Sequence, residues 1–182
     1  MFWMRRRPAL KDTALAMVDP RSHDTVLIVG GDAPALAGQS SEITRLNGRT
    51  AVIVRSDAER AAVEKAASDA GGLVYTLISA ELAIPLDEPP FQIIVLANVL
   101  AWPAAQLSAR LTDVARSLAP GGRVIAIAGV ARAGAFARLS THASTVDEKA
   151  IIATMTGAGL VAARKLASEN GVDYFEARKA RP

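Results

Sequence analysis

Apolar residues along the chain follow two patterns, which are short unbroken runs and longer runs with helical spacing. The unbroken runs predict five strands, at residues 25–29, 50–54, 73–78, 92–97 and 123–128. Runs of this kind are typical of strands that are buried on both faces of a sheet. The helical spacing predicts intervening helices at residues 34–46, 56–69 and 103–118. Strands that alternate with helices in this way indicate an α/β fold with helices on both faces of one sheet.

The end of the chain departs from this alternation. A pair suited to a capping box, Thr145 and Glu148, predicts the start of a last helix. Strands at 160–166 and 172–177 then follow, joined by a short turn at 168–171, which predicts a hairpin. The expected architecture is a Rossmann-like, doubly wound sheet of seven strands, mostly parallel, with a C-terminal antiparallel hairpin.

Length and composition favour one domain. The chain has 182 residues, of which 51% are hydrophobic, enough for one core and too few for two ordinary domains. We therefore expect a single domain over residues 1–182. It comprises an N-terminal helical segment at 1–20, which ends at Asp19-Pro20, and an α/β core at 21–179.

Several classes of function are disfavoured by composition. The chain has no cysteine and two histidines, which argues against disulfides, thiolate catalysis and a metal centre. The longest apolar segment, at 91–102, is too short to span a membrane. Basic runs at 5–7 and 178–181 contain no aromatic residues, so we interpret them as solvated and not as a nucleic-acid site. We expect a cytoplasmic protein without a membrane or nucleic-acid partner.

The first predicted strand leads into the most informative turn. Gly30 and Gly31 follow it, and a helix begins near Pro34. Backbone N–H groups and the positive end of a helix dipole converge at such a turn and favour the polar end of a nucleotide-like ligand. Ligands of open α/β sheets bind beyond the carboxyl ends of the strands. Candidate cofactor contacts at these ends are Gly30, Gly31, Asp32, Arg55, Ser56, Asp57, Ser79, Ala80, Glu81, Ala97 and Asn98.

Three segments, at 26–30, 80–95 and 116–124, carry a resemblance to a known family. Together they resemble class I S-adenosylmethionine-dependent methyltransferases, most closely the small-molecule branch of ubiquinone and menaquinone biosynthesis. The most specific part is the Leu-x-Pro-Gly-Gly-Arg turn at 118–123, and the resemblance extends over about 19–179. It implies S-adenosylmethionine lying over the first strand, with its methionine end near the glycine turn and its adenosine toward the second and third strands.

The donor-binding motifs of that family are degenerate in this sequence. The family usually carries acids at four strand ends and a turn with three glycines. The corresponding positions here are Ile28, Asp32, Pro34, Val54 or Arg55, Ser79 and Gln92. Loss of the ribose acid removes a charge-assisted interaction of about 1.5–3 kcal/mol, which Asp57 or Glu81 are the candidates to replace. Asp32 is suited either to capping the next helix or to binding a ligand ammonium.

Candidate residues for the acceptor side are few. His142 is a weak candidate for a general base toward a hydroxyl acceptor, and the alternative is an exposed loop histidine. Trp102 and Asn98 follow the fourth strand near the expected ligand, and core packing explains Trp102 equally well. Tyr174 is interpreted as a core or edge residue. Short segments around the expected pocket favour a small acceptor, an open site, or a homodimer that completes the pocket.

Three functions follow from these observations. The first is an S-adenosylmethionine-dependent methyltransferase that acts on a small molecule. The second is a non-catalytic, methyltransferase-like binding or regulatory protein that has lost normal donor binding. The third is an NADP-dependent oxidoreductase, in which Arg55 and Ser56 would receive the 2′-phosphate. The third is disfavoured because residues 30–35 do not match Gly-x-Gly-x-x-Gly.

Overall fold

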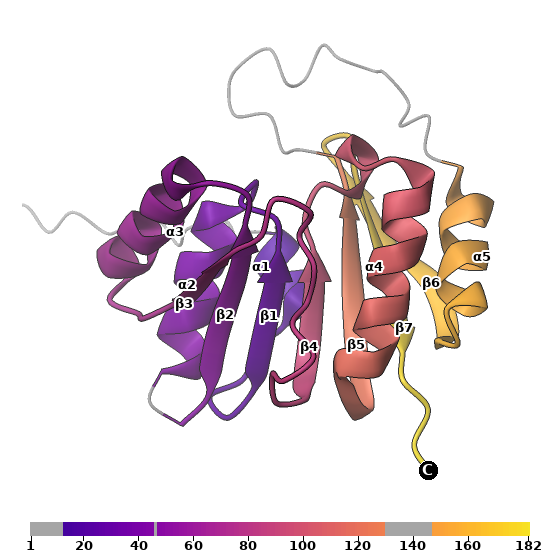
Figure 1. Ribbon diagram of the computed structural model, residues 1–182, viewed down its shortest axis with the longest axis horizontal. Helices are drawn as coiled ribbons and strands as arrows, with labels where there is room; N and C mark the ends of the chain where they lie inside the picture. The colour runs from indigo at the N-terminus through magenta and orange to yellow at the C-terminus, as the bar shows by residue number, and fades with distance from the viewer. Residues whose placement is uncertain (1–12, 46, 130–146) are drawn as a thin grey trace, which may run out of the picture.

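The computed structural model describes residues 13–45, 47–129 and 147–182. Its strands are β1 (Thr25–Val29), β2 (Arg49–Val54), β3 (Tyr75–Ile78), β4 (Phe91–Leu96), β5 (Leu118–Ala128), β6 (Val161–Glu169) and β7 (Val172–Arg178). Its helices are α1 (Thr13–Val18), α2 (Pro34–Thr44), α3 (Asp57–Ala70), α4 (Ala104–Ser117), α5 (Glu148–Gly157) and the short 3₁₀ helix η1 (Val99–Ala101). All seven strands form one sheet with helices against both of its faces (Figure 1).

The sheet is mixed, with the order β3-β2-β1-β4-β5-β7-β6. Its four pairs from β3 to β5 are parallel, whereas β7 pairs antiparallel with both β5 and β6. The expectation of a mostly parallel sheet was wrong in this respect. The hairpin inserts β7 between β5 and β6, so one reversed strand contributes two antiparallel pairs. The predicted C-terminal hairpin is confirmed.

The two faces of the sheet bury two separate apolar clusters. Leu27 and Val29 of β1 face α4, α5 and the segment before β4, whereas Val26 and Ile28 face α1, α2 and α3. All four side chains are almost completely buried. A strand covered on both faces must be apolar at every position, which explains the unbroken apolar run that predicted it.

Several element boundaries differ from the expected ones. Helix α5 is capped by Asp147, whose side chain accepts a hydrogen bond from the backbone N–H of Ala150. The proposed cap Thr145 precedes the helix and lies outside the described residues. Strand β3 begins at Tyr75, since Leu73 precedes the paired residues and is exposed. Such differences of a few residues are ordinary at element ends.

The Pro-Gly-Gly turn lies inside a strand and not between a helix and a strand. Helix α4 ends at Ser117, and β5 starts at the next residue. Phe91 pairs with Leu118 and Ile93 pairs with Arg123, so residues 119–122 form a bulge. The backbone N–H of Lys179, just after β7, donates a hydrogen bond to the carbonyl of Gly122 at 2.9 Å, and this bond holds the bulge against the C-terminal segment.

The hairpin of β6 and β7 is closed by a tight turn. Asn170 and Gly171 both have left-handed backbone conformations, with φ of 53° and 77°. Two such residues form the turn type that matches strand twist, which explains why Asn-Gly is favoured here. Across the hairpin, Lys165 donates to Asp173 at 2.9 Å, and this hydrogen bond raises the pKa of Lys165 above its ordinary value.

A glycine-to-alanine pair tests the packing of α2 on α3. A Cβ added at Gly38 of α2 would lie 2.5 Å from the carbonyl oxygen of Ala66 in α3. We predict that Gly38→Ala lowers the free energy of unfolding by about 1–3 kcal/mol, as overpacking of a rigid contact does. Denaturation in urea measures the change.

The matched control is Gly157→Ala in α5, where an added Cβ meets nothing within 4 Å. Alanine is intrinsically better than glycine in a helix by about 0.5–1 kcal/mol, so this variant should be neutral or more stable. Equal effects at the two positions would contradict the packing described for α2 and α3.

Candidate cofactor site at the carboxyl ends of the strands

The turn after β1 lies close to the end of β4. Gly30 has a φ of 109°, and a Cβ added there would lie 3.3 Å from the carbonyl oxygen of Ala97. Ala97 in turn donates its backbone N–H to the carbonyl of Val29 at 2.9 Å, which extends the pairing of β1 with β4 by one residue. Glycine is therefore required at position 30 both for its backbone conformation and for this close approach.

Helix α2 begins without a side-chain cap. Its N-cap residue is Ala33, and Pro34 occupies the first turn. The interpretation of Asp32 as an N-cap was therefore wrong. Proline suits this place because the first N–H groups of a helix have no partner within the helix. The side chain of Asp32 is 34% exposed and faces the end of β2.

Asp32, Arg55 and Glu59 form an ion-pair network between the glycine turn and the end of β2. Arg55 Nη1 lies 3.8 Å from Asp32 Oδ2 and 4.0 Å from Glu59 Oε1. Glu59 Oε2 also accepts the backbone N–H of Arg55 at 2.7 Å. Ion pairs with this exposure contribute only about 0–1 kcal/mol each, so a charged ligand can compete with them.

This network stands where the resemblance places a ribose-binding acid. Arg55 presents a cation there, and both carboxylates near it are already paired with that cation. The same pairing engages the guanidinium that the NADP hypothesis assigned to a 2′-phosphate. A sugar hydroxyl at the end of β2 would therefore compete with the Arg55 guanidinium for these two carboxylates.

Gly31 allows α3 to pack closely against the glycine turn. A Cβ added at Gly31 would lie 2.7 Å from the Cβ of Glu59, which is in the first turn of α3. Ser56 caps this helix by accepting the N–H of Glu59 at 3.3 Å. Asp57 is exposed and lies 3.6 Å from Arg60. The second glycine, Ser56 and Asp57 thus have local structural roles.

Residues after β3 form a hydrogen-bonded turn. Ser79 Oγ accepts the backbone N–H of Ala83 at 3.0 Å, and the Ser79 carbonyl accepts that of Leu82 at 2.9 Å. Ala80 and Glu81 are exposed on this turn. Their side chains do not contribute to the pocket described next.

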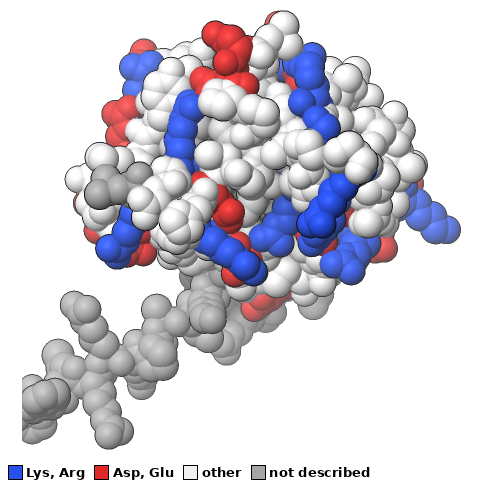
Figure 2. Space-filling view, turned by 90° about the horizontal axis from the view of Figure 1, so that it is seen from below, with Lys and Arg blue, Asp and Glu red and all other residues white. Residues whose placement is uncertain are grey.

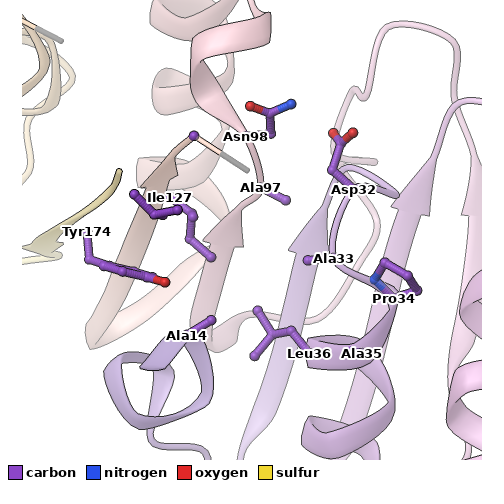
Figure 3. A pocket seen from close by; sticks show the side chains of 12 residues that line it. Ala14, Asp32, Ala33, Pro34, Ala35, Leu36, Ala97, Asn98, Ile127 and Tyr174 are labelled. Carbon is purple, nitrogen blue, oxygen red and sulfur yellow. The ribbon is translucent and has the colours of Figure 1, made fainter. Parts of the chain in front are cut away.

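A pocket of about 200 Å³ lies beside the glycine turn (Figure 3). It is lined by residues of α1, α2 and the ends of four strands, namely Ala14, Asp32, Ala33, Pro34, Ala35, Leu36, Ala97, Asn98, Ile127, Gly129, Val172 and Tyr174. Asp32 and Asn98 carry polar groups at one side, Leu36 and Ile127 present apolar side chains, and Tyr174 points its ring and hydroxyl toward the pocket (Figure 3). Ligand pockets more often enclose about 300–1,000 Å³, so this one suits a small group.

Of the expected contacts, Asp32, Ala97 and Asn98 line the pocket and the other eight do not. Sequence reasoning missed Ile127 and Gly129 at the end of β5. It assigned Tyr174 only to the core, and this residue is indeed buried. These residues could have been predicted from the C-terminal hairpin, because it brings the start of β7 beside the end of β5. Asn98 has a left-handed backbone, with a φ of 52°, which turns the chain sharply after β4.

The two acceptor-side candidates Trp102 and His142 are not among the described residues that line this pocket. Trp102 is buried in the core on the opposite face of the sheet, so its interpretation as a core residue is the one that the structure supports. His142 lies outside the described residues. Within the described ranges, no three His, Cys, Asp or Glu side chains gather in a way that could hold a metal ion. The described helices also include none with the length and apolarity needed to cross a membrane.

The fold as a whole is similar to that of solved structures. The chain superposes on the S-adenosylmethionine-dependent methyltransferase SibL with a TM-score of 0.67 at 16% identity, over 93% of this chain and 55% of that one. The fold is that of S-adenosylmethionine-dependent methyltransferases. No protein-family model matches the sequence, and the search of curated proteins found no match.

Two other structures extend this likeness within the methyltransferase fold. The N-methyltransferase NodS from Bradyrhizobium japonicum has a TM-score of 0.62 and 18% identity, over 93% of this chain and 92% of NodS. Human N-acetylserotonin methyltransferase, solved in complex with S-adenosylmethionine, has a TM-score of 0.58 and 18% identity. This chain spans 50% of the human protein, so about half of that protein has no counterpart here.

The groups near the glycine turn that could hold S-adenosylmethionine centre on Asp32. Gly30 itself is buried against Ala97. Asp32 lines the pocket and supplies a carboxylate suited to an ammonium group. The same carboxylate is one of the two that pair with Arg55, so an ammonium would compete with this guanidinium for Asp32. Both the ammonium and the ribose of a bound donor would therefore meet carboxylates that are already paired with Arg55.

The contribution of Glu59 to the network of Asp32, Arg55 and Glu59 can be tested by mutation. We predict that Glu59→Ala lowers the free energy of unfolding by about 1–2 kcal/mol, because the backbone N–H of Arg55 loses its partner. Glu64→Ala on the same helix removes only an exposed hydrogen bond to Thr76. It should change stability by less than about 0.5 kcal/mol, measured by urea denaturation. A Glu59 effect as small as that of Glu64 would show that the network does not organise the turn.

Proposed function

We propose that the protein is an S-adenosylmethionine-dependent methyltransferase that acts on a small-molecule acceptor. The observation that carries the proposal is the pocket beside the glycine turn, in a fold shared with small-molecule methyltransferases. Because fold alone does not establish activity, the proposal rests on the groups in that pocket. The Leu-x-Pro-Gly-Gly-Arg turn favours the ubiquinone and menaquinone branch as the source of the acceptor class.

Each part of the pocket has a role in this proposal. S-adenosylmethionine would supply a methyl group on a sulfonium. Asp32 would hold its ammonium, and the turn at Gly30 would allow its methionine end to approach the backbone. Leu36, Ile127 and Tyr174 would hold an apolar part of the acceptor and exclude water. Transfer needs above all an in-line approach of the nucleophile, so positioning by these walls can suffice.

Proton removal from the acceptor has one candidate in the sequence. A hydroxyl acceptor must lose its proton as the methyl group arrives, and His142 is proposed as the general base. An amine acceptor that is neutral before transfer would need no base in the methyl-transfer step itself. A cytoplasmic location and a homodimer also remain predictions.

A second candidate function is a methyltransferase-like binding protein without catalysis. The network of Asp32, Arg55 and Glu59 specifically favours it, because these internal ion pairs take the place of ribose contacts. The small pocket volume agrees with it. Such a protein would keep the scaffold while binding the donor weakly or not at all.

Calorimetric titration separates these two functions. We predict that the purified protein binds S-adenosylmethionine and S-adenosylhomocysteine, and that Gly30→Ala weakens both by about tenfold or more, since it strains the turn that the donor approaches. The control is Gly71→Ala at the end of α3, which also has a positive φ, of 76°, but whose added Cβ meets nothing. This variant should lose some stability and keep its donor affinity.

The opposite result has a clear meaning. If neither ligand binds at millimolar concentration while the protein is folded by circular dichroism, the methyltransferase proposal fails and the binding protein is favoured. If donor binds and methyl transfer to a phenol or amine panel is detected as S-adenosylhomocysteine, the non-catalytic function is rejected.

A further inference from the structure

A basic hollow lies at the opposite end of the sheet from the candidate cofactor site. It has a volume of about 420 Å³ and lies at the start of β4 and of the paired part of β5, beside the end of β7. Four arginines and two aspartates contribute its charges, namely Arg21, Arg123, Arg178, Arg181, Asp19 and Asp24. Lys and Arg side chains gather on this face of the molecule, below β4, β5 and β7 (Figure 2).

The positive charge of the hollow exceeds the negative charge around it. Asp24 accepts the backbone N–H of Arg21 at 2.8 Å, and Asp19 lies 4.0 Å from the Arg21 guanidinium. A third carboxylate, Glu176, is buried behind the hollow and is shared by Arg123, Arg164 and Arg178, at 3.8, 2.9 and 3.2 Å. One carboxylate cannot neutralise three guanidinium groups, so a net positive field remains for an anion.

Part of this cation set is held in place before any ligand binds. Arg123 donates to the carbonyls of Val18 and Asp19 at the end of α1, and its side chain is only 22% exposed. Preorganised groups lose less conformational entropy on binding than free surface side chains do. Arg123 therefore forms a fixed wall of the hollow.

The glycine bulge of β5 forms the floor. Gly121 has a φ of 75°, and a Cβ added there would lie 2.8 Å from Nε of Arg181. Glycine at this position thus allows the Arg181 side chain to lie across the backbone of the turn. Arg181 has no ion pair or hydrogen bond in the described structure, so its guanidinium is available to a ligand.

We propose that this hollow binds a small phosphate-bearing anion, such as a pyrophosphate or phosphomonoester group. The planar guanidinium fork matches phosphate oxygens with two parallel hydrogen bonds. The described residues that line the hollow include no aromatic side chain on which a base could stack, which favours a small anion over a single-stranded nucleic acid.

This site is independent of the proposed methyl transfer. Arg123 and Ala128 mark the two ends of the regular part of β5, and six residues of strand span roughly 17–20 Å. A small molecule in one site cannot reach the other. The hollow can therefore be occupied whether or not the protein binds S-adenosylmethionine.

Titration with inorganic pyrophosphate at low ionic strength tests the proposal. We expect saturable 1:1 binding that weakens as salt is added. Arg181→Gln and Arg21→Gln should each weaken it by about tenfold or more, because each removes a charge-assisted contact. Arg181→Lys should fall between the wild type and Arg181→Gln, since it keeps the charge and loses the fork. Lys65→Gln removes an exposed charge on α3 and should bind as the wild type does.

Other outcomes would overturn the proposal. These are absence of pyrophosphate binding at millimolar concentration, equal weakening by Lys65→Gln and Arg181→Gln, or binding of a single-stranded oligonucleotide without binding of pyrophosphate. Circular dichroism of each variant verifies the fold. Donor titration on the same variants should be unchanged, so failure here leaves the methyltransferase proposal untouched.

Discussion

The burial of β1 on both faces is the constraint on which the rest of the structure depends. Val26, Leu27, Ile28 and Val29 each lie in one of the two apolar clusters, so α1 to α3 must cover one face and α4 with α5 the other. The strand also pairs with β2 and β4. Its end at Gly30 consequently lies in the middle of the sheet edge, with the ends of β2 and β4 on either side.

Charged groups at that edge compete with a ligand for the same space. Arg55 bridges Asp32 and Glu59, and each contact is long and partly exposed. The network is therefore weak enough to be opened, although it pairs both carboxylates near the end of β2 with a cation. In the proposed methyltransferase, donor affinity would depend on the difference between two small free energies, those of the internal ion pairs and of the ligand contacts. For this reason the fold and the activity have to be argued separately.

The two ends of the sheet have different chemistry because different segments meet there. At the carboxyl ends, Asp32 and Asn98 lie beside apolar side chains of β5 and β7. At the amino ends, the reversed strand β7 brings Arg178 and the following residues beside the bulge of β5. The antiparallel hairpin thus shapes both sites, closing one with Tyr174 and supplying cations to the other.

Local pattern alone determined the strands, the helices and the hairpin. The apolar run at 25–29 predicts a strand that is buried on both faces, and Asn170-Gly171 predicts the hairpin turn. Both predictions depend only on residues that are adjacent in sequence. The turn at Gly30 could also be predicted from the sequence, because glycine is the residue that tolerates both a positive φ and the close approach to Ala97. Tertiary structure decided the rest. The pairing of Arg55 with Asp32, the packing of Gly31 on Glu59 and the contacts of Glu176 with Arg123 and Arg164 join residues from separate elements. Such contacts depend on how helices and strands pack in space, and no spacing along the chain encodes them.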